Sequence, residues 1–189
     1  MIVRIAFALI TLVMIERFVE LRLAAKYAVM LRNAGAHEID ADHFYWFFIV
    51  HGGFFISLCL EIWYGKASLQ SIWPPALLVF AGAQALRLWS ILTLGQNWNV
   101  RIFVQPGASP VTTGPYRYLR HPNYLAVTLE ILTLPLVFYA VGTAILFSLL
   151  NFLLLRRRIM LEEAAWMRET DYARIMREHK RWLFWGRIS

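Results

Sequence analysis

The sequence predicts an all-α, polytopic integral membrane protein with about five transmembrane helices and a C-terminal cytoplasmic helix. Of its 189 residues, 59% are hydrophobic and only 16% are charged, and the mean hydropathy is positive. Soluble domains carry roughly 25% charged residues, so this composition indicates a membrane protein. Several apolar stretches also approach or reach the roughly 20 residues that a helix needs to cross a bilayer.

The first predicted transmembrane helix covers about residues 2–27. Its apolar run, 2–15, has the character of a signal peptide, but charged residues follow it in place of a small-residue cleavage pattern. Because this run is shorter than a span of roughly 20 residues, we expect a retained helix that continues beyond it. Glu16 and Glu20 are four residues apart and share one helix face. They either face a polar cavity or extend towards the lipid headgroups.

Two further spans are predicted at about 43–64 and 72–94. The first is rich in aromatic residues, and the second is interrupted by Arg87. The polar segment 33–42 precedes the first span, and a short loop, 65–70, separates the two. Each apolar stretch is long enough to cross a bilayer as a helix.

The apolar segment 122–155 is too long for one span and predicts a helical hairpin. Pro135 and Gly142 interrupt the segment near its middle, and both residue types favour a break in a helix. We therefore expect two helices, at about 122–138 and 140–156.

The basic residues predict how these five spans are oriented. One side of the membrane would carry most of the arginines and lysines, whereas the other side would carry only Arg4 and Lys66. Arg and Lys are enriched on the cytoplasmic side of membrane proteins. We therefore expect the N-terminus outside and the C-terminus in the cytoplasm, together with the polar segments 95–121 and 157–189.

The composition also excludes several kinds of site and partner. The single cysteine, Cys59, lies in an apolar run, so we expect no internal disulfide and no metal site. The net charge of +7 is explained by basic residues that lie beside anionic lipid headgroups. The chain has no G-x-G-x-x-G or Walker-type loop and no nucleic-acid motif. We therefore expect the lipid bilayer, and not a nucleic acid, as its partner.

The segment Thr112–Tyr124, T-T-G-P-Y-R-Y-L-R-H-P-N-Y, concentrates polar and aromatic residues just before the hairpin. Its Gly-Pro pair marks a turn, and Pro122 suits the first turn of a helix because it has no N–H to donate. The free N–H groups of that turn, with Arg120 and His121 beside them, would bind an anionic group such as a carboxylate. Alternatively, these residues only anchor a helix at the membrane interface.

Two ordered motifs point to a chemical role. The first, G-x-Y-x-x-x-R-H-P-x-Y, comprises Gly114, Tyr116, Arg120, His121, Pro122 and Tyr124. The second, an arginine followed four residues later by Glu-Glu, comprises Arg158 and Glu162-Glu163. Together they resemble the signature of the isoprenylcysteine carboxyl methyltransferase and phospholipid methyltransferase families, which are small integral-membrane enzymes that use S-adenosylmethionine. The resemblance covers about residues 90–172.

The resemblance implies a single membrane methyltransferase domain over residues 1–189, with its cofactor site in the cytoplasm. By position, it implies that Arg158 holds the methyl acceptor and that Glu162 contacts S-adenosylmethionine. An upstream glutamine of the family corresponds to Gln105 or Gln96, and the family's F-G-x-x-Y ending is represented only by Thr170-Asp171-Tyr172. The other cofactor-binding residues that it implies are Val111, Tyr116, Arg120, His121, Pro122, Asn123 and Tyr124.

Three ionisable residues are predicted to lie at one depth within the bundle. His51, Arg87 and Glu130 are each about eight residues from the cytoplasmic end of their span, or about 12 Å at roughly 1.5 Å per residue. Ionisable groups at such depth usually face a bundle interior or a cavity. An Arg87–Glu130 pair with His51 nearby either lines a substrate pocket or only fixes the register of the helices. With Arg158, these three are the candidate catalytic residues.

The resemblance also implies the reaction, a methyl transfer in which catalysis is chiefly alignment and exclusion of water. Glu130, Glu20 or His51 would take a proton if the acceptor is an un-ionised hydroxyl. The segment 35–44 is similar to bacterial members of the family, some of which methylate hydroxyls on alkylpyrone or alkylresorcinol lipids. We therefore expect an O-methyltransferase for a lipophilic small molecule in a bacterial inner membrane, with prenylcysteine carboxylate as the alternative acceptor.

Two other classes of protein remain open. Membrane sterol reductases use NADPH and are similar in their C-terminal half, although they are longer. A non-enzymatic membrane scaffold would explain the helices but would leave the polar segment 95–121 without a role. The two classes differ in their expected ligand, because a reductase binds NADPH and a scaffold binds neither cofactor.

Overall fold

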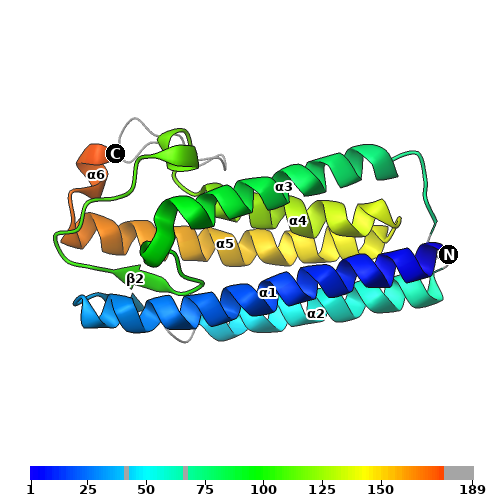
Figure 1. Cartoon of the computed structure of the whole chain (residues 1–189), viewed down its shortest axis with the longest axis horizontal. Coiled ribbons are helices and arrows are strands. Elements are labelled where there is room, and N and C mark those ends of the chain that lie inside the picture. The colour runs from blue at the N-terminus through cyan, green and yellow to red at the C-terminus, as the bar shows by residue number, and fades with distance from the viewer. Residues whose placement is uncertain (41–42, 66–67, 177–189) are drawn as a thin grey trace.

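The computed structural model describes residues 1–40, 43–65 and 68–176, and it consists mainly of long helices that lie side by side (Figure 1). Successive long helices run in opposite directions, which brings the connections 34–40 and 95–121 to one end of the bundle. We call these connections, together with residues 157–176, the polar end. The helices are α1 (Ile2–Asn33), α2 (His43–Tyr64), α3 (Trp73–Leu94), α4 (Pro122–Val137), α5 (Val141–Glu169) and α6 (Tyr172–Ile175), with 3-10 turns η1 (Gly95–Asn97) and η2 (Gly114–Arg117).

Three of the long helices begin and end within one residue of their predicted limits. Helix α2 has the limits predicted for the second span, whereas α3 starts one residue late and α4 ends one residue early. The hairpin breaks between α4 and α5, where Tyr139 adopts a positive φ of 61°. Pro135 is buried in the last turn of α4, so the predicted interruption lies where the chain turns back.

The predicted separate C-terminal helix is corrected by the structure. Helix α5 continues without a break from the apolar segment to Glu169, and α6 adds only one further turn. The reason is local, because residues 156–169 contain no glycine or proline and are rich in strong helix formers. Arg158 and Glu162 therefore project from the continuation of α5 beyond its apolar part. Residues 177–189 of the predicted C-terminal region lie outside the described residues.

The all-α prediction missed a short antiparallel ribbon. Strand β1 (His37–Ile39) pairs with β2 (Ile102–Val104), with His37 opposite Val104. Glu38 binds Arg32 of α1 at 2.8 Å and Arg101 at 2.6 Å. The ribbon thus joins the segment after α1 to the segment after α3 and closes one side of the polar end.

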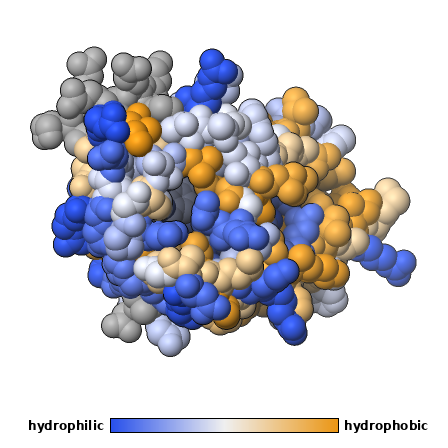
Figure 2. Space-filling view, turned by 60° about the vertical axis from the view of Figure 1, so that its left-hand side comes forward, coloured by the Kyte–Doolittle hydropathy of each residue, from blue (hydrophilic) through white to orange (hydrophobic). Residues whose placement is uncertain are grey.

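Apolar side chains fill the bundle away from the polar end, and others cover its outside. On the face shown in Figure 2, hydrophobic residues lie along the flank and hydrophilic residues gather towards the polar end. Among the described residues, Tyr45–Tyr64 and Trp73–Asn97 are helical and apolar enough to cross a membrane, yet only 17% and 28% of these windows are buried. A core helix of a soluble protein would be mostly buried, so this exposed apolar surface indicates contact with lipid. The main buried cluster includes Ala6, Ile10, Val13, Phe54, Leu58, Ile62, Phe80, Ile131, Leu134 and Phe147.

Candidate active site

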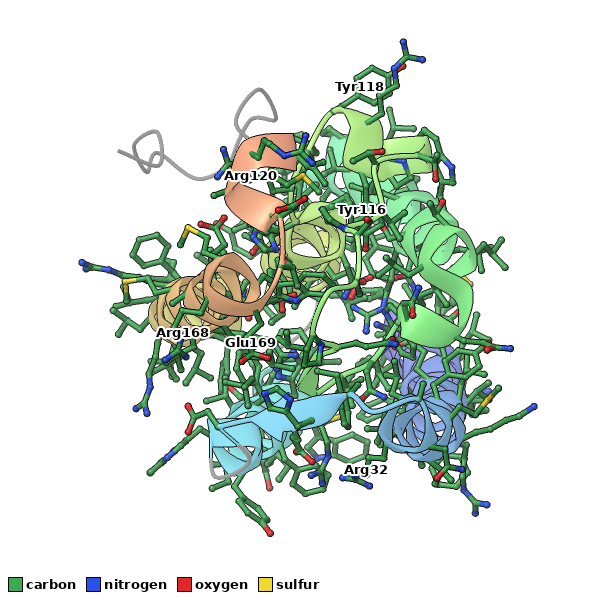
Figure 3. The ribbon with its side chains drawn as sticks, turned by 90° about the vertical axis from the view of Figure 1, so that its left-hand side faces the viewer. Arg32, Tyr116, Tyr118, Arg120, Arg168 and Glu169 are labelled. Carbon is green, nitrogen blue, oxygen red and sulfur yellow. The ribbon has the colours of Figure 1, made fainter. Side chains whose placement is uncertain are left out.

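The first motif begins with a turn that only glycine fits. Gly114 has a φ of 56°, and a Cβ there would collide with Thr93 Oγ1 and lie 3.2 Å from Trp89 Nε1. This close approach packs η2 against α3 and fixes the directions in which the next side chains point. Tyr116 points inward and is 7% exposed, whereas Tyr118 points outward and is 63% exposed (Figure 3).

The start of α4 holds a carboxylate of the chain itself. Helix α4 begins at Pro122, as predicted, with His121 at the N-cap. His121 Nε2 lies 3.1 Å from Glu163 Oε1, and Arg120 Nη1 lies 3.7 Å from the same oxygen. All of these side chains are buried. The sequence indicated an anionic group such as a carboxylate here, and in the described contacts the carboxylate beside Arg120 and His121 is that of Glu163.

Adjacent residues of a helix point about 100° apart, so the two side chains of the Glu-Glu pair contact different residues. Glu163 faces the Arg-His pair of the first motif, and Glu162 faces Tyr124. The sequence analysis assigned a role only to Glu162. The signal in the sequence was the second glutamate of the pair, because two adjacent glutamates on one helix reach two different sets of residues.

The hydroxyl of Tyr124 links the two motifs. Arg158 Nε donates to this hydroxyl at 2.7 Å, and the hydroxyl donates to Glu162. Arg158 Nη2 also donates to the carbonyl of Val100 at 2.8 Å. The ring of His121 stacks on that of Tyr124, with centroids 5.2 Å apart and planes at 13°. Arg158 and Glu162 share one helix face, as their spacing predicted.

A cavity of about 150 Å³, which we call the polar cavity, lies among these residues at the polar end. Pro122 does not line it, because this residue is buried in the first turn of α4 and positions its neighbours. Arg158 lines it as well. The predicted cofactor-binding residues that line it are Gln105, Val111, Tyr116, Arg120, His121, Asn123, Tyr124 and Glu162.

The walls of the polar cavity contain buried polar atoms that need a ligand. Trp98 Nε1, Asn123 Oδ1 and the hydroxyl of Tyr172 are buried and have no hydrogen-bond partner among the described residues. Buried polar groups almost always have hydrogen-bond partners, so these atoms indicate that the cavity binds a polar ligand. Burial, with a smaller contribution from Glu162, raises the pKa of Tyr116 and of Tyr172 above the usual tyrosine value. Both phenols therefore remain protonated donors.

A second cavity of about 240 Å³, which we call the apolar cavity, lies inside the bundle. Its apolar lining comes from Leu21, Phe47, Phe48, Phe55, Val100, Val127 and Leu155. Four residues, Asn99, Asn123, Tyr124 and Arg158, line both cavities. We call these four the shared wall. A polar and an apolar compartment therefore meet at Tyr124 and Arg158.

An ion cluster borders the apolar cavity. Arg87 donates to both oxygens of Glu20, from Nε at 2.7 Å and from Nη2 at 2.6 Å, and its Nη1 lies 3.5 Å from Glu130. Arg17 Nη1 lies 3.1 Å from Glu20 and 3.5 Å from Glu130. The expected Arg87–Glu130 contact is present, but Glu20 is the closer partner. Glu130 lines neither cavity, because its carboxylate faces the two arginines. His51 lines the apolar cavity outside this cluster.

The comparisons with known proteins bear on the same region. Residues 76–168, which contain both motifs, match the family model described as "Isoprenylcysteine carboxyl methyltransferase (ICMT) family". The "Uncharacterized protein YpbQ" of Bacillus subtilis is 36% identical over 157 residues, which cover 83% of this chain and 94% of the relative. An "Uncharacterized protein" of Haemophilus influenzae is 27% identical over 150 residues, which cover 79% and 87% of the two chains. No solved structure matches the chain.

Proposed function

This chain belongs to the isoprenylcysteine carboxyl methyltransferase family, which consists of membrane methyltransferases, and from this premise we propose that it is an S-adenosylmethionine-dependent O-methyltransferase. Its acceptor is a hydroxyl on a lipophilic small molecule of the alkylpyrone or alkylresorcinol kind. The observation that carries this proposal is the shared wall, where a polar cavity meets an apolar one. Transfer between a polar donor and a lipophilic acceptor needs both molecules held in line at one point.

The residues of the polar cavity fit the cofactor. Glu162 and the unpartnered Oδ1 of Asn123 offer acceptors for an ammonium group and other donors, and Trp98 Nε1 and the Tyr172 hydroxyl offer donors. The aromatic faces of Trp98 and Tyr116 favour a nearby cation. When bound, S-adenosylmethionine supplies an electrophilic methyl group on a positively charged sulfur.

Arg158 is suited to orient the methyl acceptor. Its Nε and Nη2 are held by Tyr124 and by the carbonyl of Val100. Among the described residues, no hydrogen bond from its Nη1 is found, so this donor is available for an acceptor oxygen. A guanidinium fixed by two bonds loses little further freedom when it binds, and catalysis here is mainly alignment.

The same proposal includes the arrangement in the membrane. We propose one domain with five spans, at about 2–27, 43–64, 72–94, 122–138 and 140–156, in a bacterial inner membrane. The alternating direction of the long helices and their exposed apolar flanks support this topology. Basic residues are concentrated at the polar end, which supports the proposal that this end and the cofactor site lie in the cytoplasm and the N-terminus outside.

Calorimetry on detergent-purified protein tests the cofactor site. We expect S-adenosylmethionine and S-adenosylhomocysteine to bind, and Glu162→Ala and His121→Ala to weaken binding at least about tenfold, or roughly 1.4 kcal/mol. Asp171→Ala removes the same charge from an exposed surface ion pair with Arg174 at the same end, and should leave the affinity unchanged.

Binding of NADPH in place of these ligands would reveal a reductase. Folded protein that binds neither cofactor would contradict the methyltransferase proposal and favour a scaffold.

A further inference from the structure

We propose that His51 accepts the proton of the methyl acceptor, and that the acceptor is therefore a weakly acidic, un-ionised hydroxyl, such as a lipid phenol, and not a carboxylate. This inference rests on the proposed function. A carboxylate has already lost its proton near neutral pH, so a proton acceptor in the acceptor cavity would serve no purpose for it.

The hydrogen bond of His51 determines which ring nitrogen is available. Nδ1 lies 2.8 Å from the carbonyl oxygen of Phe47, one turn earlier in α2. A carbonyl only accepts hydrogen bonds, so Nδ1 carries the proton and donates it. Imidazole has an ordinary pKa of about 6.5 and is mostly neutral above pH 7. In the neutral ring, Nε2 then holds a lone pair, and no hydrogen bond to it is found among the described residues.

His51 lies close to the shared wall. Its ring centroid is 6.1 Å from that of Phe47, and the guanidinium of Arg158 lies over the same Phe47 ring at 5.1 Å. Phe47 therefore contacts both His51 and the residue that we expect to orient the acceptor oxygen. His51 and Arg158 both line the apolar cavity.

The other ionisable groups around the apolar cavity are less suited to accept a proton. Glu20 receives two hydrogen bonds from Arg87 and an ion pair from Arg17. Both oxygens of this carboxylate are therefore already occupied by donors of the chain. Glu130 lies outside the lining and faces the same two arginines. Of the lining residues that could accept a proton, His51 and Glu20, only His51 lacks an ion-pair partner within the described part of the chain.

The proton and electron balance of the step is simple. The O–H bond of the acceptor breaks, and its proton forms an N–H bond at His51 Nε2. The electron pair left on oxygen forms the bond to the methyl carbon, while the pair of the carbon–sulfur bond leaves with the thioether. His51 then returns the proton to water after product release, so no oxidant or reductant is needed.

A pair of acceptors that differ in acidity tests this role. One is a long-chain alkylphenol with an ordinary phenol pKa of about 10, and the other is its ring-dinitrated analogue, which is fully ionised at neutral pH. A general base contributes roughly 10²–10⁴-fold. We expect His51→Gln to lower kcat on the alkylphenol by about 100-fold or more, and to change kcat on the nitrated analogue by less than about threefold, because no proton remains to be transferred.

The matched control is Phe55→Leu, which changes the apolar cavity without touching a proton acceptor. It should alter the KM of both acceptors by a similar factor. If His51→Gln slows both acceptors equally, or neither, then His51 is not the proton acceptor. If wild-type protein binds S-adenosylhomocysteine but methylates neither acceptor, the acceptor class is wrong. Failure to bind S-adenosylhomocysteine at all would instead overturn the proposed function.

A spectroscopic measurement provides a readout that does not depend on turnover. Histidine labelled with nitrogen-15 distinguishes the two neutral tautomers, and the signal missing from His51→Gln identifies His51 among the five histidines. We expect a neutral ring protonated on Nδ1 in the protein without ligands. A ring protonated on Nε2 would contradict the proposal. If His51→Gln does not bind S-adenosylhomocysteine, His51→Ala with added imidazole replaces it, and imidazole should restore the rate on the alkylphenol alone.

Discussion

Glu162 and Glu163 are neighbours in the chain, and their carboxylates act on different parts of the molecule. Glu162 accepts from the Tyr124 hydroxyl and lines the polar cavity. We expect Glu162→Gln to weaken binding of S-adenosylhomocysteine at least about tenfold, or roughly 1.4 kcal/mol, because a charged acceptor is lost. The temperature of thermal unfolding should change little. Calorimetry and a thermal scan of the same sample check both statements.

Glu163→Gln should affect the stability of the protein, whereas Glu162→Gln should affect ligand binding. This carboxylate is 1% exposed and lies beside His121 and Arg120. Loss of its charge leaves the buried Arg120 guanidinium poorly compensated, which costs about 3 kcal/mol. We therefore expect a clear fall in the thermal unfolding temperature. An unchanged temperature in detergent would show that the contact between the two motifs is not structural.

Arg158→Lys tests the fixed guanidinium. Lysine has one nitrogen and cannot reach both Tyr124 and the carbonyl of Val100 as Nε and Nη2 do. We expect kcat/KM for the lipid acceptor to fall by about 100-fold, or roughly 2.7 kcal/mol. Affinity for S-adenosylhomocysteine should stay within about threefold, since Glu162 and Asn123 remain in place. A parallel loss of cofactor affinity would place Arg158 in the cofactor site instead.

The sequence predicts site residues well where spacing alone fixes geometry. The Arg158–Glu162 spacing and the Pro122 start of α4 are examples, because both depend on one helix. Prediction from the sequence fails where a contact depends on how two helices are rotated relative to each other. Only Glu130 was predicted beside Arg87, and the rotations of α1 and α4 bring Glu20 into the closer contact. Tyr172 follows the end of α5 and reaches the polar cavity only through the turn into α6.

At the scale of elements, the end of the bundle opposite the polar end has its own polar contact. Glu61 of α2 accepts from the backbone N–H of Gly142 at 3.0 Å, from that of Thr143 at 2.7 Å and from the Thr143 hydroxyl at 2.6 Å. These N–H groups belong to the first turn of α5 and have no partner within the helix. A carboxylate from a neighbouring helix therefore caps α5 and complements its dipole.

Glu61→Ala should lower the free energy of unfolding by about 2 kcal/mol, because the cap and its charge are both lost. Affinity for S-adenosylhomocysteine should be unchanged in the folded fraction, because the polar cavity is at the other end of the bundle. Thermal unfolding and calorimetry on the purified variant measure the two effects. A loss of affinity in folded protein would mean that the two ends are coupled.

The helices were more predictable than the ribbon for a physical reason. Long apolar runs such as 43–64 can satisfy their backbone groups in a membrane only as helices. Strands β1 and β2 are three residues long, too short for an alternating pattern, and they pair across distant parts of the chain. The continuation of α5 through Arg158 was missed because a run of basic residues resembles the end of a span.

For the whole molecule, the topology makes a direct prediction. In a Cys59→Ala background, Gln70→Cys should react with a membrane-impermeant maleimide on intact cells, since it lies in the connection between α2 and α3. Arg117→Cys, in η2 at the polar end, should react only after permeabilisation. Both residues are exposed in the structure. The reverse pattern would invert the orientation and move the cofactor site out of the cytoplasm.

The measurement that tests the central claim most directly is methyl transfer itself. Purified protein in lipid nanodiscs is incubated with methyl-deuterated S-adenosylmethionine and an alkylpyrone or alkylresorcinol, and the lipid product is analysed by mass spectrometry. The account predicts an O-linked deuterated methyl group, formed by the wild-type protein and greatly reduced in Arg158→Lys and Glu162→Gln. Binding of S-adenosylhomocysteine without any transfer to these acceptors would contradict the claim that the polar and apolar cavities meet at a site of lipid O-methylation.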